Sequence, residues 1–248
     1  MDQPKDVEGR AAKATAGTAA VEVKATVVDR DEERALSKLS LERKHGEPRR
    51  IFFYDTPKLD LYTKRVALRA REKDGDECDS TVKIRPVEPA RIGDRWRKEA
   101  GFKIESDIVG PNVIRSASLT VPQGRKEIDE VASGAREICK LFSREQEEFL
   151  AAMAPVAVDW GKLVALGPVA ALRWKCRHDG FPYYELCVEE WRLPDRRDVI
   201  EISIKAKQPE AAAAQAALEG FLAELGIERE LREQTKTRTA LAYFAERD

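Results

Sequence analysis

Hydrophobic and polar residues alternate along many short stretches of the chain, which is the pattern of β-strands with one buried face. The stretches are Ala20–Val28, Arg50–Asp55, Val66–Glu72, Ser80–Arg85, Trp96–Ile104, Ala170–Arg177, Tyr183–Leu193, Val199–Lys207 and part of Glu230–Phe244. In most of them Arg, Lys or Glu residues share the face opposite the apolar residues. The pattern therefore predicts a sheet with one apolar and one charged face.

Three other stretches carry apolar residues at helical spacing, namely Arg30–Arg43, Gly124–Met153 and Pro209–Leu225. Pro155 and Gly226 are suited to end the second and third of these helices. Residues 1–18 show no periodicity and predict a disordered tail, which leaves 19–248 as a single domain. We therefore predict an α+β fold in which helices cover the apolar face of the sheet.

The charged faces would meet one another if the sheet closed into a barrel. The cationic residues on these faces are Lys24, Arg69, Arg71, Lys83, Arg85, Arg97, Arg173, Lys175, Arg177, Lys205, Lys236 and Arg238. The acidic ones are Glu22, Glu99, Glu185, Glu189 and Glu201. Twelve positive minus five negative charges leaves +7, in a chain whose net charge is −1. Because unpaired buried charge is costly, such an interior should hold water and a polyanion.

The alternative interpretation is that these are solvated faces of an open sheet, which are normally polar. The residue pattern alone leaves both interpretations open. The balance of 44 basic and 45 acidic residues predicts no attraction to nucleic acid or to acidic membranes. Four cysteines without CxxC spacing, and only two histidines, argue against a zinc site and for a reducing cytoplasm.

The central stretch also resembles a known family. It reads FYDTP at Phe53–Pro57, LY at Leu61–Tyr62 and ALRAR at Ala67–Arg71, which is similar to the YFDTP…L…ALRxR segment of the CYTH superfamily of triphosphate tunnel enzymes. Later segments that resemble this family's strands are Arg173–Lys175, Glu185–Glu189 and Glu201–Lys205. The resemblance implies a closed barrel of eight antiparallel strands, surrounded by helices, whose charged tunnel binds triphosphate and a divalent metal.

The resemblance also implies roles for individual residues. Lys24 and Glu22 stand at the positions of the lysine and second glutamate in the family's first-strand signature, and they would be catalytic. The phosphate chain would be bound by Arg69, Arg71, Lys83, Arg85, Arg97, Arg173, Lys175, Lys205, Lys236 and Arg238. Mg²⁺ or Mn²⁺ would be held by Glu22, Glu185, Glu189 and Glu201.

Two departures from the family pattern lead to two hypotheses about activity. Ala20 replaces the first glutamate of the ExExK signature, and Ser203 stands where the family often has a second acid. The first hypothesis is a metal-dependent hydrolase of inorganic triphosphate or of an organic triphosphate. The second is a tunnel that binds polyphosphate or a nucleotide with little or no turnover. Cyclase chemistry is less favoured, because no feature of the sequence suits a nucleobase.

Overall fold

The computed structural model describes residues 20–28, 31–75, 77–195, 198–230 and 236–245. The predicted tail, residues 1–18, lies outside these ranges. The strands are β1 (Ala20–Thr26), β2 (Glu47–Asp55), β3 (Val66–Lys73), β4 (Cys78–Ile84), β5 (Phe102–Val109), β6 (Asn112–Gln123), β7 (Val164–His178), β8 (Phe181–Arg192) and β9 (Val199–Lys207).

These strands form a closed mixed barrel in the order β1-β5-β6-β4-β3-β2-β7-β8-β9, which closes because β1 also pairs with β9. β1 and β5 run parallel, whereas β1 and β9 run antiparallel. The predicted α+β barrel is therefore confirmed, with two differences. The described residues form nine strands rather than eight, and the barrel is not purely antiparallel.

The helices are α2 (Glu32–Lys38), α3 (Asp60–Thr63), α4 (Asp94–Arg97), α5 (Arg125–Ala132), α6 (Arg144–Met153), α7 (Ala211–Glu224) and α8 (Lys236–Ala245). Single 3₁₀ turns occur at Arg43–His45, Pro89–Arg91, Ile138–Leu141, Trp160–Lys162 and Gln208–Glu210. Within the described ranges, no helix combines the length and the apolar character needed to cross a membrane.

By its internal contacts the chain divides into two compact units. The first unit comprises Met1–Glu47, Glu105–Arg115 and Leu172–Lys236, and the second comprises Pro48–Ile104, Ser116–Ala171 and Thr237–Asp248. The assignment of 19–248 to a single domain stays a prediction.

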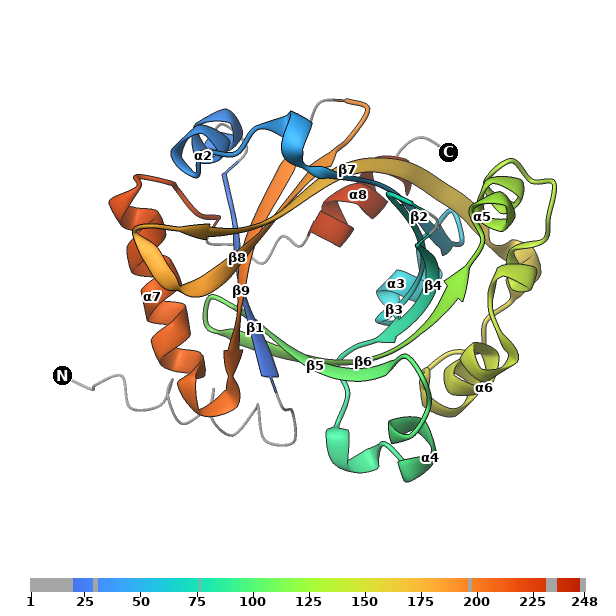
Figure 1. The fold of residues 1–248 in the computed structure, drawn as a ribbon. Helices are drawn as coiled ribbons and strands as arrows, with labels where there is room; N and C mark the ends of the chain where they lie inside the picture. The colour runs from blue at the N-terminus through green and yellow to red at the C-terminus, as the bar shows by residue number, and fades with distance from the viewer. Residues whose placement is uncertain (1–19, 29–30, 76, 196–197, 231–235, 246–248) are drawn as a thin grey trace. The chain divides into compact units, whose positions relative to one another are not determined.

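In the first unit, α7 lies along β1 and β9 (Figure 1). The alternation of β1 turns Val21 and Val23 into a core that also contains Ile202 and Ile204 of β9 and Leu218 of α7. Glu22 and Lys24, which alternate with these valines on β1, therefore lie on the opposite face of the strand.

In the second unit, the buried side chain of Gln146 attaches α6 to β4 and β6. Its amide nitrogen donates to the carbonyl oxygens of Ser80 and Leu119, and its amide oxygen accepts from the Ser80 hydroxyl. The same oxygen accepts the backbone N–H of Ser143, which completes the capping box that begins α6. This cap is one reason why the predicted helix Gly124–Met153 is instead two helices.

The aspartate of the FYDTP segment has a structural role in the same unit. Asp55 is 3% exposed and accepts the backbone N–H groups of Thr56, Leu61 and Tyr62, so it fixes the turn into α3. Burial raises the pKa of Asp55, and the three backbone donors act in the opposite direction.

The predicted strand Trp96–Ile104 is wrong over its first half. Asp94–Arg97 form the short helix α4, and β5 begins only at Phe102. Gly101 has a φ of 78°, and a Cβ there would lie 2.0 Å from the Thr120 carbonyl oxygen, so the chain turns sharply at this glycine. Arg97 and Glu99 are therefore not on a strand face.

Residues 105–123 were not predicted to be strands, although they contain half of β5 and all of β6. Ser106, Asp107 and Ile108 are all buried, as are Ser116 and Leu119, so these strands are buried on both faces. A strand buried on both faces has no polar–apolar alternation from which it can be recognised.

The prediction for Glu230–Phe244 is also corrected. Lys236–Ala245 form the helix α8, so Lys236 and Arg238 lie on a helix rather than on a strand.

Candidate functional site

A cluster of carboxylates around two lysines lies on the charged face of the first unit. The Lys24 ammonium is 3.2 Å from Glu22 Oε2, 3.2 Å from Asp107 Oδ1 and 3.9 Å from Glu201 Oε1. The Lys236 ammonium is 2.9 Å from the same Glu201 oxygen and is also paired with Glu189. Glu201 therefore links the two lysines, and we call these six residues the lysine–carboxylate cluster.

Strand register accounts for this convergence. β1 pairs with β5 so that Glu22 lies opposite Asp107, and with β9 so that Lys24 lies opposite Ser203. β8 pairs with β9 so that Glu189 lies opposite Glu201. Side chains opposite each other in a sheet are neighbours, so three strand pairs bring these acids to one place.

The cluster keeps both lysines charged. Burial alone would lower the pKa of Lys24, but attraction to Glu201, Asp107 and Glu22 outweighs it and raises this pKa well above its usual value. Burial also opposes the charge of Lys236, yet Glu189 and Glu201 raise its pKa in the same way. The indole of Trp191 lies beneath the Lys236 ammonium, 5.2 Å from ring centroid to nitrogen.

Ser203, which stands where the family often has an acid, belongs to the same face. Its hydroxyl donates to Glu22 Oε1 at 2.9 Å, and its side chain is buried. Ser203 thus orients the one glutamate that remains of the first-strand signature. Ala20, the other departure, is exposed and lies opposite Lys207 on β9.

The donor chemistry of the cluster suits a hard divalent cation, because Glu22, Asp107, Glu189 and Glu201 offer carboxylate oxygens. In the conformation of this structure these oxygens contact ammonium groups instead. Across the described ranges, no three His, Cys, Asp or Glu side chains are arranged to hold a metal ion. Residue type therefore fits Mg²⁺ or Mn²⁺, while the carboxylates are held by Lys24 and Lys236.

The second unit has a cationic face on β3 and β4. Arg69 and Arg71 alternate with the buried Leu68 and Ala70, and Lys83 alternates with buried neighbours on β4. This confirms the predicted face assignment for both strands. Arg85 follows directly after the end of β4 and continues the same alternation.

Asp79 is the acid of this face. Arg71 donates to it through Nε at 3.1 Å and Nη2 at 3.0 Å, and the Lys73 ammonium lies 3.0 Å from its Oδ2. The Thr81 hydroxyl is 3.3 Å from its Oδ1. Burial would raise the pKa of Asp79, but Arg71, Lys73 and the more distant Arg69 together lower it.

The remaining predicted site residues are more scattered. On β7, Arg173 Nε donates to Cys187 Sγ at 3.2 Å and its Nη1 lies 4.0 Å from Glu47. Lys175, Glu185 and Lys205 are exposed, so Glu185 is not part of the cluster. The Arg97 guanidinium donates to the backbone carbonyls of Pro89 and Ile92, and Arg238 is exposed on α8.

Asp79 and Asp107 were not among the acids predicted on the charged faces. Asp79 lies one residue before the predicted strand Ser80–Arg85, although it continues the spacing of Thr81 and Lys83. Asp107 belongs to the stretch that lacked any visible alternation. With these two acids added, and with Arg97, Glu99 and Arg238 off the strand faces, the predicted positive excess of the charged faces was too large.

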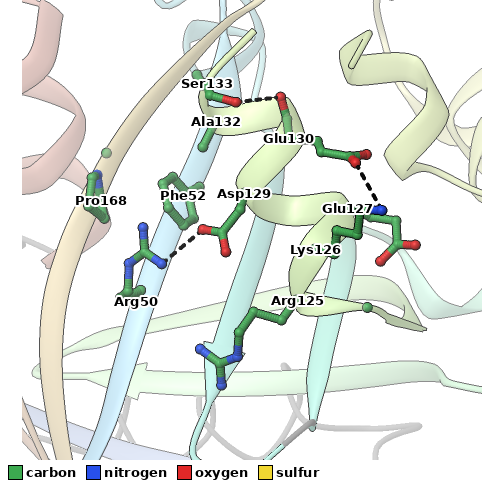
Figure 2. Close-up of a pocket in the computed structure, with 13 residues that line it drawn as sticks. Arg50, Phe52, Arg125, Lys126, Glu127, Asp129, Glu130, Ala132, Ser133 and Pro168 are labelled. Atoms are coloured by element: carbon green, nitrogen blue, oxygen red, sulfur yellow. Dashed lines mark hydrogen bonds and ion pairs between the residues drawn. The ribbon is translucent and has the colours of Figure 1, made fainter. Parts of the chain in front are cut away.

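A pocket of about 980 Å³ lies elsewhere, on the helix-covered face of the second unit beside α5 (Figure 2). Arg50 and Asp129 meet across it at 3.0 Å, and Phe52 and Pro168 form apolar parts of its wall. Arg50 also donates to the buried Glu72 at 2.8 Å. None of the predicted site residues lines it, so we assign it no role.

Comparison with solved structures identifies similar proteins. HpAC1 from Hippeastrum, a candidate adenylyl cyclase described as having a dominant triphosphatase activity, superposes with a TM-score of 0.61 at 21% identity, covering 90% of this chain and 96% of that one. A candidate adenylate cyclase from Bacillus halodurans gives a TM-score of 0.58 at 15% identity, covering 89% and 97%. The chain therefore has the same overall fold as these two proteins. The sequence itself matches no family model and no curated protein.

This shared fold agrees with the closed barrel that the FYDTP and ALRAR segments led us to expect. At these identities the likeness concerns the fold alone. The activity has to be argued from the residues of this chain.

Proposed function

We propose that this chain is a metal-dependent hydrolase that acts on inorganic triphosphate or on an organic compound that carries a triphosphate. The observation that carries the proposal is the lysine–carboxylate cluster on the charged face of a CYTH-like fold. Four partly or fully buried carboxylates around two lysines are a costly arrangement that packing alone would not favour. The triphosphatase activity described for HpAC1 supports hydrolysis over cyclisation as the reaction.

In this proposal Glu22, Asp107, Glu189 and Glu201 hold the divalent cation. A cation there would supply positive charge to phosphate oxygens and increase the nucleophilicity of water. Lys24 and Lys236 hold the acids in place before the cation enters, since each contacts Glu201. Ser203 keeps Glu22 oriented through its hydroxyl.

The cationic residues bind the phosphate chain. Arg69, Lys83 and Arg85 of the second unit, and Arg173 of the first, present positive charge on strand faces, which suits phosphoryl oxygens. As charge spreads over these oxygens in the transition state, fixed cations stabilise it without reorganising.

The deciding experiment measures phosphate release from inorganic triphosphate with Mg²⁺, with Mn²⁺ and with a chelator. Activity should require the metal and should fall about 100-fold or more in Glu22→Ala. The matched control is Glu185→Ala, which removes an exposed acid that lies outside the cluster and should retain activity. Activity that survives both the chelator and Glu22→Ala would overturn the proposal.

The second candidate is a protein that binds triphosphate or polyphosphate without turnover. It is favoured by the loss of an acid at Ala20 and by the ammonium groups that contact the remaining carboxylates. Tight triphosphate binding without phosphate release under either metal would establish it. Ala20→Glu separates the two, because this exposed position can accept the missing acid, and a gain in turnover would mean that the acid was limiting.

We also propose that the protein acts on small molecules in the cytoplasm, with neither nucleic acid nor membrane as a partner. Its four cysteines are all free thiols, which agrees with a reducing compartment. Its net charge of −1 gives no overall attraction to polyanionic surfaces.

A further inference from the structure

The two cations at one end of the second unit's charged face are already occupied by an acid. β3 and β4 pair so that Arg71 lies opposite Asp79, Arg69 opposite Thr81 and Ala67 opposite Lys83. Asp79 therefore lies at the end of the face nearest to Lys73, and Arg85 lies beyond its other end.

Arg71 uses one edge of its guanidinium to bind an acid of the protein. Its Nε and Nη2 both donate to Asp79, one to each carboxylate oxygen. This forked arrangement is the one that arginine uses to bind phosphate, so the same edge cannot serve both anions. Lys73 contacts the same carboxylate at 3.0 Å.

Asp79 is well placed to keep this arrangement. It is 4% exposed, and the Thr81 hydroxyl adds a further contact to its Oδ1. Like charges brought together in a poorly solvated place repel strongly, so a phosphate that approached Arg71 would also meet the carboxylate of Asp79. The cationic face is thus closed at this end by an anion of the protein itself.

We propose that Asp79 determines specificity by ending the phosphate-binding face at Arg69, so that the chain binds triphosphate and discriminates against longer linear polyphosphates. The proposal rests on the proposed function of this face. It assigns Arg71 and Lys73 to Asp79 rather than to the phosphate chain.

The test compares the affinities for inorganic triphosphate and for inorganic pentaphosphate by calorimetry, in the wild type and in Asp79→Asn. The asparagine removes the negative charge and leaves a single acceptor oxygen, so at least one donor of the Arg71 fork is released. The affinity for pentaphosphate should rise about tenfold, as expected for one added charge-assisted hydrogen bond, and that for triphosphate by less than about threefold. The ratio of the two affinities is the readout, because a general loss of folding would not move it upward.

Asp129→Asn is the matched control. It makes the same change of charge in the same unit, but at a half-exposed acid of α5 that pairs with Arg50 on the helix-covered face. Its affinity ratio should equal that of the wild type. If both variants raise the ratio alike, net charge is responsible and the proposal is wrong.

The affinities of the variant Lys73→Gln give a second test, whose outcome does not depend on whether Asp79→Asn folds. Because Lys73 is already paired with Asp79, its loss should change the affinity for either anion by less than about threefold. A larger loss would show that Lys73 binds phosphate and would overturn the proposal. An unchanged or reduced ratio in folded Asp79→Asn would also overturn it. If the wild type bound no triphosphate at all, the proposed function itself would fail.

Discussion

In the first unit two lysines lie among four carboxylates, whereas in the second unit one aspartate lies among Arg69, Arg71 and Lys73. Two positive minus four negative charges leaves −2 in the first group, and three positive minus one negative leaves +2 in the second. The first group therefore has the charge to accept a further cation, whereas in the second group Arg71 and Lys73 are already paired with Asp79. In each unit, charges of the majority sign are thus paired with a smaller number of opposite charges.

The largest effect on stability is expected when one of the two lysines is removed from the lysine–carboxylate cluster. Lys24→Met leaves Glu22, Asp107 and Glu201 without their shared cation. Breaking a buried ion pair in this way should reduce the free energy of unfolding by about 3 kcal/mol, measured in urea. Lys205→Met removes an exposed lysine of β9 and should cost less than about 0.5 kcal/mol. Equal losses would mean that the cluster has no special stability.

The next effect concerns the cations of the second unit. Arg69→Ala and Arg85→Ala should each weaken the binding of inorganic triphosphate about tenfold, since each removes a charge from the phosphate-binding face. Arg91→Ala is the control, because Arg91 lies in a 3₁₀ turn and pairs with Glu88. Unchanged affinity in both test variants would show that triphosphate does not bind to this face.

The two units should also differ in the direction of their pH dependence. The raised pKa values of Lys24 and Lys236 mean that their contribution to stability is complete below about pH 10.4 and is lost as pH rises through the folded-state values. The lowered pKa of Asp79 means that its contribution is present above about pH 3.9 and is lost as pH falls through the folded-state value.

Urea unfolding across pH measures this difference. The stability gap between wild type and Lys24→Met should close on the alkaline side as the lysine loses its proton, and the gap between wild type and Asp79→Asn should close on the acid side. A gap that closed near neutral pH in either variant would contradict the assigned charge states.

The smallest effect is expected at Ser203. Ser203→Ala removes the hydroxyl that donates to Glu22, so this glutamate loses its orientation but keeps its charge and its contact with Lys24. Phosphate release should fall about threefold, with the stronger effect at low Mg²⁺ concentration. Ser118→Ala, a buried serine of β6 in the second unit, should leave the metal dependence unchanged.

Much of the fold could be predicted because most strands alternate apolar with charged or polar residues along the sequence. The limits of β9 and the faces of β3, β4 and β8 follow directly from alternation, since Ile202 and Leu186 are buried while Glu201 and Glu189 lie opposite. The prediction was wrong where that contrast was absent. β5 and β6 are buried on both faces, and α4 and α8 contain the charged spacing of a strand but form helices.

By itself the sequence determined which side chains share a face, because a strand alternates its side chains whatever it packs against. It therefore placed Glu22 with Lys24, and Arg69 with Arg71. Only the tertiary structure decided which strands are neighbours and in what register, and so brought Asp107 to Lys24 and Asp79 to Arg71. Register depends on turns and packing far along the chain, which is why Lys236, on a helix, could join acids of β8 and β9.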